Sequence, residues 1–219
     1  DRCVHGRARR GLGRRPSAAR GLVGRRPLAV AITGGIAAGK TEALAAFERR
    51  GAAVVSADEL VHRIYREDDE LKGALRERWG DGVFGEGGEV DRAAVAAIVF
   101  ADRAELDWLE SVLHPLVRDA HVTWLDEQLS RPDPPRLVVA EIPLLYESGG
   151  EARYDKVVAL TAAPAVRTER RGAFAEREAR LIPDEEKLRR ADFAYVNDGT
   201  LEELDAFVGR VFEELASSS

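Results

Sequence analysis

The sequence predicts an α/β fold built on a five-stranded parallel sheet. Short apolar runs rich in β-branched residues alternate with runs of helical period along residues 28–215, and this alternation is typical of parallel strands joined by helices. The 219 residues are enough for one well-buried domain of this class. A composition of 45% hydrophobic and 33% charged residues is that of an ordinary soluble protein.

The first predicted strand, Leu28–Thr33, leads into a glycine-rich loop and then a helix over Glu42–Arg50. The loop has the complete Walker A pattern, G-x-x-x-x-G-K-[ST], in which backbone N–H groups surround phosphate oxygens. This pattern between a strand and a helix predicts the three-layer P-loop NTPase fold. It also predicts that the chain binds ATP through the loop residues Gly34, Gly35, Ile36, Ala37, Ala38, Gly39, Lys40, Thr41 and Glu42.

Two side chains of the loop carry chemistry. Lys40 is expected to reach the β- and γ-phosphates as a point charge, and to face solvent when no phosphate is bound. The hydroxyl of Thr41 is expected to be a ligand of the Mg²⁺ that accompanies ATP. The loop therefore predicts a nucleotide site with Mg²⁺ as the cofactor.

The second predicted strand, Ala52–Val55, ends at Ser56-Ala57-Asp58. Open α/β sheets bind ligands at the carboxyl ends of their strands, so Asp58 is a candidate for the site. Asp58 also suits the N-cap of the next predicted helix, Glu59–Arg66.

Residues 62–130 are too long a connection for a simple crossover, so we expect them to form a helical subdomain inserted over the carboxyl edge of the sheet. Helices are predicted around Glu70–Trp79, over Arg92–Phe100 with Asp91 as N-cap, and from Asp102 to about Leu129. His114-Pro115 interrupts the last pattern, which predicts two helices or a kink there.

The remainder of the chain returns to alternating strands and helices. The predicted elements are strands at Leu137–Ile142, Val157–Leu160 and Phe193–Val196, a helix that starts near Pro164, a short helix at Asp184–Arg190, and a closing helix at Thr200–Leu215 with Thr200 as N-cap and Glu203 at N3.

Residues 1–27 have a different composition from the rest. They contain nine arginines and one acidic residue, a formal +8 within a net charge of −6, so residues 28–219 carry −14. Such a segment is expected to be disordered. It is a basic arm for RNA or anionic lipid, an organellar transit peptide, or the result of a fragment or an upstream-extended reading frame whose true start lies near Val23. The acidic remainder argues against general nucleic-acid binding.

The cysteine content and the lengths of the apolar runs indicate the cellular compartment and whether the chain spans a membrane. The single cysteine, Cys3, has no partner within the chain, and this usage favours a cytoplasmic protein. No apolar run approaches the ~18 residues of a membrane-spanning helix, so neither a membrane nor a nucleic acid is expected as a partner. The sequence leaves the oligomeric state open.

Six segments together resemble dephospho-coenzyme A kinases: TGGIAAGKT (33–41), SADELVH (56–62), LHPLVR (113–118), EIPLLYE (141–147), DEEKLRRAD (184–192) and NDG (197–199). The resemblance covers residues 28–215. It implies transfer of the γ-phosphate of ATP to the ribose 3′-hydroxyl of dephospho-CoA, the last step of CoA synthesis. Two positions depart from the usual pattern, because Ser56 and Glu141 stand where the family commonly has aspartate.

The resemblance also implies roles for individual residues. Asp58 faces the ribose hydroxyl, and Lys40 and Arg171 complete the catalytic set. A lid at about 167–182 supplies Arg171 and Arg177 to the phosphates, while its other arginines are expected at the surface. Asn197 lies in a loop that contacts adenine. The residues assigned to the acceptor are Asp58, His114, Arg118, Pro143 and Leu144.

Some questions stay open at this point. Glu141 either holds a Mg²⁺-bound water near Thr41 or caps arginine contacts. A kinase for another small molecule or a nucleoside monophosphate has the same core, although the His-Pro and Ile-Pro-Leu-Leu segments argue against it. A switch-type NTPase is disfavoured because Asn-Lys-x-Asp and Asp-x-x-Gly signatures are absent from the sequence.

Overall fold

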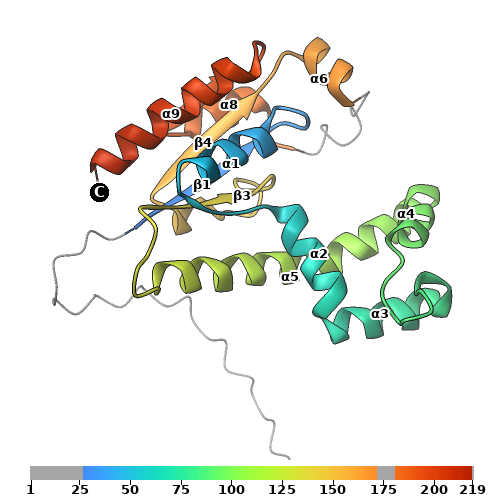
Figure 1. Ribbon diagram of the computed structural model, residues 1–219. Coiled ribbons are helices and arrows are strands. Elements are labelled where there is room, and N and C mark those ends of the chain that lie inside the picture. The colour runs from blue at the N-terminus through green and yellow to red at the C-terminus, as the bar shows by residue number, and fades with distance from the viewer. Residues whose placement is uncertain (1–26, 172–180, 219) are drawn as a thin grey trace, which may run out of the picture.

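A computed structural model describes residues 27–171 and 181–218. Its sheet has five strands, all parallel, in the order β2-β3-β1-β4-β5 (Figure 1). The prediction of an α/β fold with a five-stranded parallel sheet is therefore confirmed. The strands are β1 (Leu28–Gly34), β2 (Ala53–Val55), β3 (Leu137–Glu141), β4 (Lys156–Thr161) and β5 (Phe193–Val196).

The helices lie where the sequence predicts them, with ends that differ by a few residues. They are α1 (Lys40–Arg49), α2 (Ala57–Glu67), α3 (Asp69–Trp79), α4 (Arg92–Ala101), α5 (Arg103–Leu129), α6 (Pro164–Arg171), α8 (Asp184–Arg190) and α9 (Leu201–Ser218). The predicted disordered tail at 1–26 and the lid residue Arg177 lie outside the described residues.

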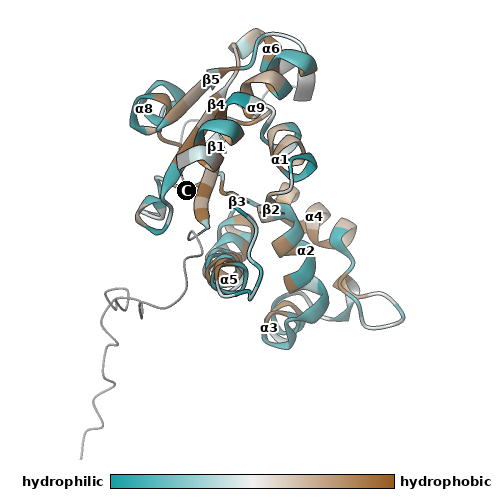
Figure 2. Cartoon of the chain, turned by 60° about the vertical axis from the view of Figure 1, so that its left-hand side comes forward, coloured by the Kyte–Doolittle hydropathy of each residue, from teal (hydrophilic) through white to brown (hydrophobic). Residues whose placement is uncertain are grey.

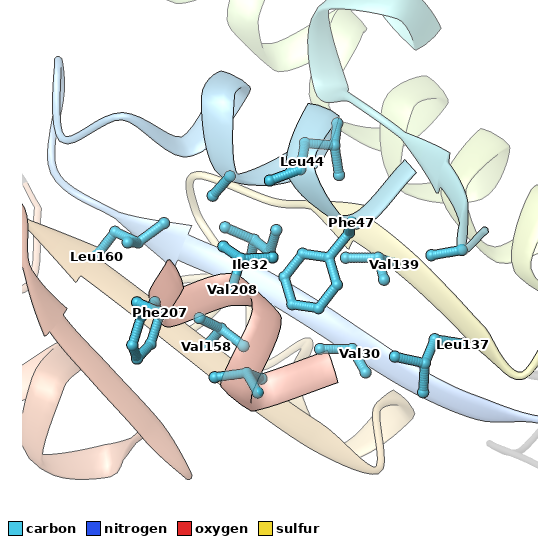
Figure 3. Packing of buried hydrophobic residues seen from close by; sticks show 14 of the residues in the cluster. Val30, Ile32, Leu44, Phe47, Leu137, Val139, Val158, Leu160, Phe207 and Val208 are labelled. Carbon is cyan, nitrogen blue, oxygen red and sulfur yellow. The ribbon is translucent and has the colours of Figure 1, made fainter. Parts of the chain in front are cut away.

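Strand β1 occupies the centre of the sheet, and its side chains alternate between the two faces. Val30 and Ile32 face one cluster, which includes Phe47 of α1 and Val208 of α9 (Figure 3). All four side chains are completely buried. Because α1 and α9 cover this face together, the phosphate loop between β1 and α1 is attached to the most rigid part of the molecule.

The opposite face of the sheet is covered by α5 and by the segment around α8. Ala29 of β1 packs in one cluster with Trp124 and Leu125 of α5. Ala31 packs in another with Leu145 and Tyr146, which follow β3. Most of the helices show both hydrophilic and hydrophobic sides in Figure 2, as expected for helices that cover a sheet. The arrangement has three layers: helices, sheet, helices.

Helices α2, α3, α4 and the first half of α5 bury a hydrophobic cluster of their own. This cluster includes Leu71, Leu75, Val95 and Leu109. The four helices lie between β2 and β3 in the chain and extend to one side of the sheet, opposite α9 (Figure 1). No helix within the described ranges is both long and apolar enough to cross a membrane.

Helix α5 corrects one expectation. It runs as one helix from Arg103 to Leu129 with Pro115 inside it, so of the two expected alternatives, two helices or a kink, the first is wrong. A proline removes one backbone hydrogen bond and is unfavourable inside a helix. Here both halves are fixed by packing, because Leu109 belongs to the cluster with α3 and α4, and Trp124 packs against the sheet.

The start of α2 corrects a second expectation. Ser56, not Asp58, is the N-cap: the backbone N–H of Glu59 donates to Ser56 Oγ (3.1 Å), and the backbone N–H of Ser56 donates to Glu59 Oε2 (2.9 Å). This reciprocal capping box uses the S-x-x-E spacing of 56–59. Asp58 is left exposed in the first turn of α2.

Replacing Ser56 with alanine is expected to lower the free energy of unfolding by about 1 kcal/mol, the usual loss for an N-cap serine. Chemical denaturation followed by circular dichroism measures it. The control is Asp58→Asn, which leaves the capping box intact. If Asp58→Asn destabilised the protein more than Ser56→Ala, the assignment of the cap would be wrong.

Candidate functional site

The phosphate loop is shaped by glycines at two positions that other residues would strain. Gly34 has φ +137° and Gly39 has φ +93°, values that side chains rarely allow. A Cβ on Gly34 would also collide with the carbonyl oxygen of Leu160 in β4. Gly35 N–H donates to that same oxygen (3.2 Å). The loop is thus anchored on the neighbouring strand.

The side chain of Lys40 is less exposed to solvent than the sequence predicts. Its Nζ is folded back onto the loop and donates to the carbonyl oxygens of Gly35 (2.7 Å) and Gly34 (3.2 Å). Burial lowers the pKa of its ammonium group, and the nearby carboxylate of Glu141 opposes that shift. The expectation of a solvent-facing Lys40 is therefore wrong: the loop carbonyls provide acceptors that keep a half-buried cation satisfied.

Glu141 ends β3 beside Ile32 of β1, and it is only 9% exposed. Burial raises the pKa of its carboxyl group, Lys40 acts in the opposite direction, and the negative charges of Asp58 and Glu59 raise it further. Asp58 also acts on the ammonium group of Lys40. Lys40, Asp58 and Glu141 therefore share one electrostatic neighbourhood at the carboxyl edge of the sheet, as expected for the ends of parallel strands.

The first turn of α1 presents Thr41 and Glu42, and both residues are exposed. Their place directly after Lys40 lets a bound phosphate meet the positive end of α1.

Asn197, at the end of β5, is 3% exposed and donates from Nδ2 to the carbonyl oxygen of Ala38 (3.0 Å). The same amide group lies against Gly39, where a Cβ would collide with it. Asn197 thus holds the second half of the phosphate loop in place. This contact is with the protein backbone, whereas the sequence predicted a contact with adenine.

The described part of the lid lies at the end of α6. Arg171 is the last residue of this helix. Arg167, expected at the surface, is instead 8% exposed and pairs with Asp184 of α8 (Nη1–Oδ2 3.4 Å). That expectation is wrong, because α8 covers Arg167 and supplies a partner for its charge.

The acceptor candidates fall in two places. Pro143 and Leu144 are half-buried in the loop after β3. The carbonyl oxygen of Pro143 accepts hydrogen bonds from Thr33 Oγ1 (3.3 Å) and Lys187 Nζ (3.5 Å). His114 and Arg118 are exposed on α5.

The only ion pair that the described residues give Arg118 is with the adjacent Asp119 (Nε–Oδ1 3.2 Å). The structure therefore brings Pro143 close to the phosphate-loop strand, but it shows no contact from His114 or Arg118 to that strand.

Sequence reasoning missed Lys187 as a member of the site. This lysine is 1% exposed and pairs with Glu147 (Nζ–Oε1 2.7 Å). Its positive charge contributes to lowering the pKa of Lys40. Glu147 also accepts the backbone N–H of Ile182 (3.1 Å). The segments EIPLLYE and DEEKLRRAD contain both partners, but nothing in either segment indicates that they meet.

Replacing Lys187 with methionine is expected to lower the free energy of unfolding by about 3 kcal/mol, because it leaves Glu147 as a poorly solvated carboxylate without its cation. Arg189→Met, an exposed cation on the same helix, is the control and should cost less than about 1 kcal/mol. Equal losses in denaturant titrations would contradict a structural role for the Lys187–Glu147 pair.

Comparisons with known proteins agree with this arrangement. Residues 28–203 match the dephospho-CoA kinase family. A dephospho-CoA kinase of Bartonella quintana is 34% identical over 85% of this chain and 97% of its own length. A second, from Rhodopseudomonas palustris, is 34% identical over 86% and 96%.

Two solved structures are similar throughout. A crystal structure of TT1252 from Thermus thermophilus superposes with a TM-score of 0.64 at 33% identity, covering 87% of this chain and 99% of that chain. A dephospho-CoA kinase from Campylobacter jejuni gives a TM-score of 0.64 at 27% identity, covering 87% and 98%. The α/β fold, the phosphate loop and the sequence similarity lead to one conclusion. The chain belongs to the dephospho-CoA kinase family.

Proposed function

We propose that this protein transfers the γ-phosphoryl group of ATP to the ribose 3′-hydroxyl of dephospho-CoA, giving CoA and ADP. Family membership supports the substrates. The single observation that carries the chemistry is that the phosphate loop, Glu141 and Asp58 lie at the carboxyl ends of the neighbouring parallel strands β1, β3 and β2. A cation for phosphates and a carboxylate for a hydroxyl are therefore at the same edge of the sheet, where their charges act on one another.

Asp58 is proposed to orient the acceptor. Its carboxylate is exposed at the start of α2 and is not used for capping, so it is available to accept a hydrogen bond from the ribose hydroxyl. A carboxylate is a weak base for an alcohol, but phosphoryl transfer has a loose transition state. Orienting the oxygen and accepting its proton late in the reaction are therefore sufficient.

The transfer itself exchanges one bond for another. A bond forms between the ribose O3′ and the γ-phosphorus, and the bond from that phosphorus to the bridging oxygen of ADP breaks. The hydroxyl proton passes to Asp58. Lys40, which lies against the carbonyls of Gly34 and Gly35, is proposed to turn toward the β- and γ-phosphates when ATP binds and to stabilise the charge on their oxygens.

Arg171 and Arg177 are proposed to bind the same phosphates from the lid. Arginine forks match the geometry of phosphate oxygens, and Arg171 ends the helix whose buried Arg167 lies beside the phosphate loop. Catalysis would then rely on positive charge from two sides, the loop and the lid.

The residues present fit Mg²⁺ that arrives with ATP. No cluster of three or more histidine, cysteine, aspartate or glutamate residues suited to a metal occurs among the described residues, whereas the exposed hydroxyl of Thr41 stands where phosphate binds. Mg²⁺ commonly takes one or two protein oxygens and fills its remaining positions with phosphate and water. When bound it would neutralise phosphate charge; Thr41 would be its protein ligand, and Glu141 would accept a hydrogen bond from a coordinated water.

The acceptor is proposed to lie between the loop after β3, with Pro143 and Leu144, and the helical segment 62–130, with His114 and Arg118. We propose that this segment is an acceptor-binding insertion. Its own hydrophobic cluster allows it to hold its shape while it faces the sheet. Asn197 is proposed to serve the nucleotide side by fixing the phosphate loop.

The function is tested by ADP release from ATP and Mg²⁺ with a panel of acceptors: dephospho-CoA, AMP, CMP and pantothenate. We expect turnover with dephospho-CoA and phosphate at the 3′ position of the product by NMR. Turnover with another acceptor only would assign the protein to a different small-molecule kinase activity.

A further inference from the structure

A buried ion pair lies against the phosphate loop at Gly35. Arg167 of α6 and Asp184 of α8 have side chains that are 10% and 19% exposed, and Arg167 Nη1 lies 3.4 Å from Asp184 Oδ2. Arg167 lies in α6 and Asp184 lies in α8, which comes later in the chain. The pair therefore joins these two helices.

The carboxylate of this pair is itself held by the sheet. Thr161, the last residue of β4, donates from Oγ1 to Asp184 Oδ2 (2.6 Å). Strand β4 pairs with β1 up to the phosphate loop, with Leu160 opposite Gly34. Asp184 is consequently fixed relative to the loop by a short hydrogen bond to a neighbouring strand.

Both members of the pair lie directly on Gly35. A Cβ at this glycine would be 2.5 Å from Asp184 Oδ2 and 2.8 Å from Arg167 Nη1. Gly35 does not have a positive φ, so the close approach of this pair, and not the backbone conformation, is what requires glycine here. The guanidinium group thus stands at the loop that binds phosphates.

The charges of Arg167 and Asp184 have opposite effects on a phosphate bound at the loop. A carboxylate beside a triphosphate repels it, so Asp184 alone opposes ATP binding. A guanidinium attracts phosphate oxygens, and a carboxylate partner holds it in one orientation. A buried ion pair seldom adds much stability compared with apolar packing, so stability alone is a weak explanation for its presence against Gly35.

We infer that Asp184 is a positioning residue that holds the guanidinium of Arg167 over Gly35, where Arg167 binds the β- and γ-phosphates of ATP. This inference rests on the proposed function for its substrate ATP, but it does not depend on the identity of the acceptor. Arg167 acts on the phosphates and Asp184 acts through Arg167.

The test measures binding of ATP and of AMP to Asp184→Asn, Arg167→Gln and the double variant by calorimetry, without acceptor. Asp184→Asn keeps the size of the side chain. We expect each single variant to weaken ATP binding about tenfold, the equivalent of one charge-assisted hydrogen bond, with AMP binding unchanged. The double variant should bind ATP no more weakly than Arg167→Gln, because Asp184 acts through Arg167 and, without that partner, only repels the triphosphate.

Glu185→Gln is the matched control, because it makes the same charge change at an exposed position of α8 and should leave ATP binding unchanged. Arg167→Lys, which keeps the charge, should recover part of the affinity lost in Arg167→Gln. This second comparison decides the role of Arg167 even if Asp184→Asn does not fold.

Three results would overturn the inference: unchanged ATP affinity in Arg167→Gln, unchanged ATP affinity in a folded Asp184→Asn, or additive losses in the double variant. The last would mean that Asp184 acts independently of Arg167. These titrations use no acceptor. Their results can therefore be interpreted even if the acceptor panel shows that dephospho-CoA is not the substrate.

Discussion

Asp58→Asn is expected to lower kcat by about 10²–10⁴, the range for general acid–base groups, with little change in the affinity for ATP. Asparagine keeps the size of the side chain but cannot take the proton of the ribose hydroxyl. Initial rates at saturating ATP and dephospho-CoA measure the change in kcat.

The capping assignment makes this result interpretable. Because Ser56 and Glu59 cap α2 without Asp58, Asp58→Asn should retain the thermal stability of the wild type. A variant that kept kcat and lost only stability would show that Asp58 supports α2 and that the acceptor is oriented elsewhere. Glu141, another carboxylate whose charge acts on Lys40, would be the next residue to change.

Lys40→Met is expected to lower kcat by about 10²-fold or more, the usual loss when a preorganised charge is removed from a transition state. In the structure the ammonium group is bound only to loop carbonyls, those of Gly34 and Gly35, among its described hydrogen bonds. We expect it to supply charge to the phosphates when they bind, and we expect the fold to persist without it.

The matched control for Lys40 is Arg49→Met, which removes an exposed cation from the other end of the same helix. Arg49 pairs with Asp205 at the surface, where its side chain is 58% exposed, so this change should leave kcat unaltered. Rates from a coupled ADP assay and melting curves distinguish the two variants. A Lys40→Met protein with more than about a tenth of wild-type kcat would contradict the role given to Lys40.

The sequence predicted the elements of the sheet well because their signals are local. Apolar runs of strand length, the glycines of the phosphate loop, and the caps at Asp91 and Thr200 each depend on residues that are neighbours in the chain. Asp91 accepts from two backbone N–H groups of α4, and Thr200 forms a reciprocal pair with Glu203. Both caps are confirmed.

The start of α2 also has a local signal. The spacing from Ser56 to Glu59 is the same capping-box pattern as that from Thr200 to Glu203, and it is sufficient to place the helix start at Ser56, although Asp58 suits an N-cap by residue type. Helix α5 is a different case: Pro115 is locally a helix breaker, and only the packing of both halves of the helix on other elements keeps it continuous.

The sequence by itself therefore determined the α/β class, the phosphate loop, the approximate positions of the helices and the family. The tertiary structure decided which charged side chains are buried: Arg167 with Asp184, and Lys187 with Glu147. It also showed that Lys40 is folded onto its own loop. A run of charges predicts a solvated face, because an isolated charge is costly to bury. Burial becomes possible only when a partner distant in the sequence is brought alongside, and that is a property of the folded chain.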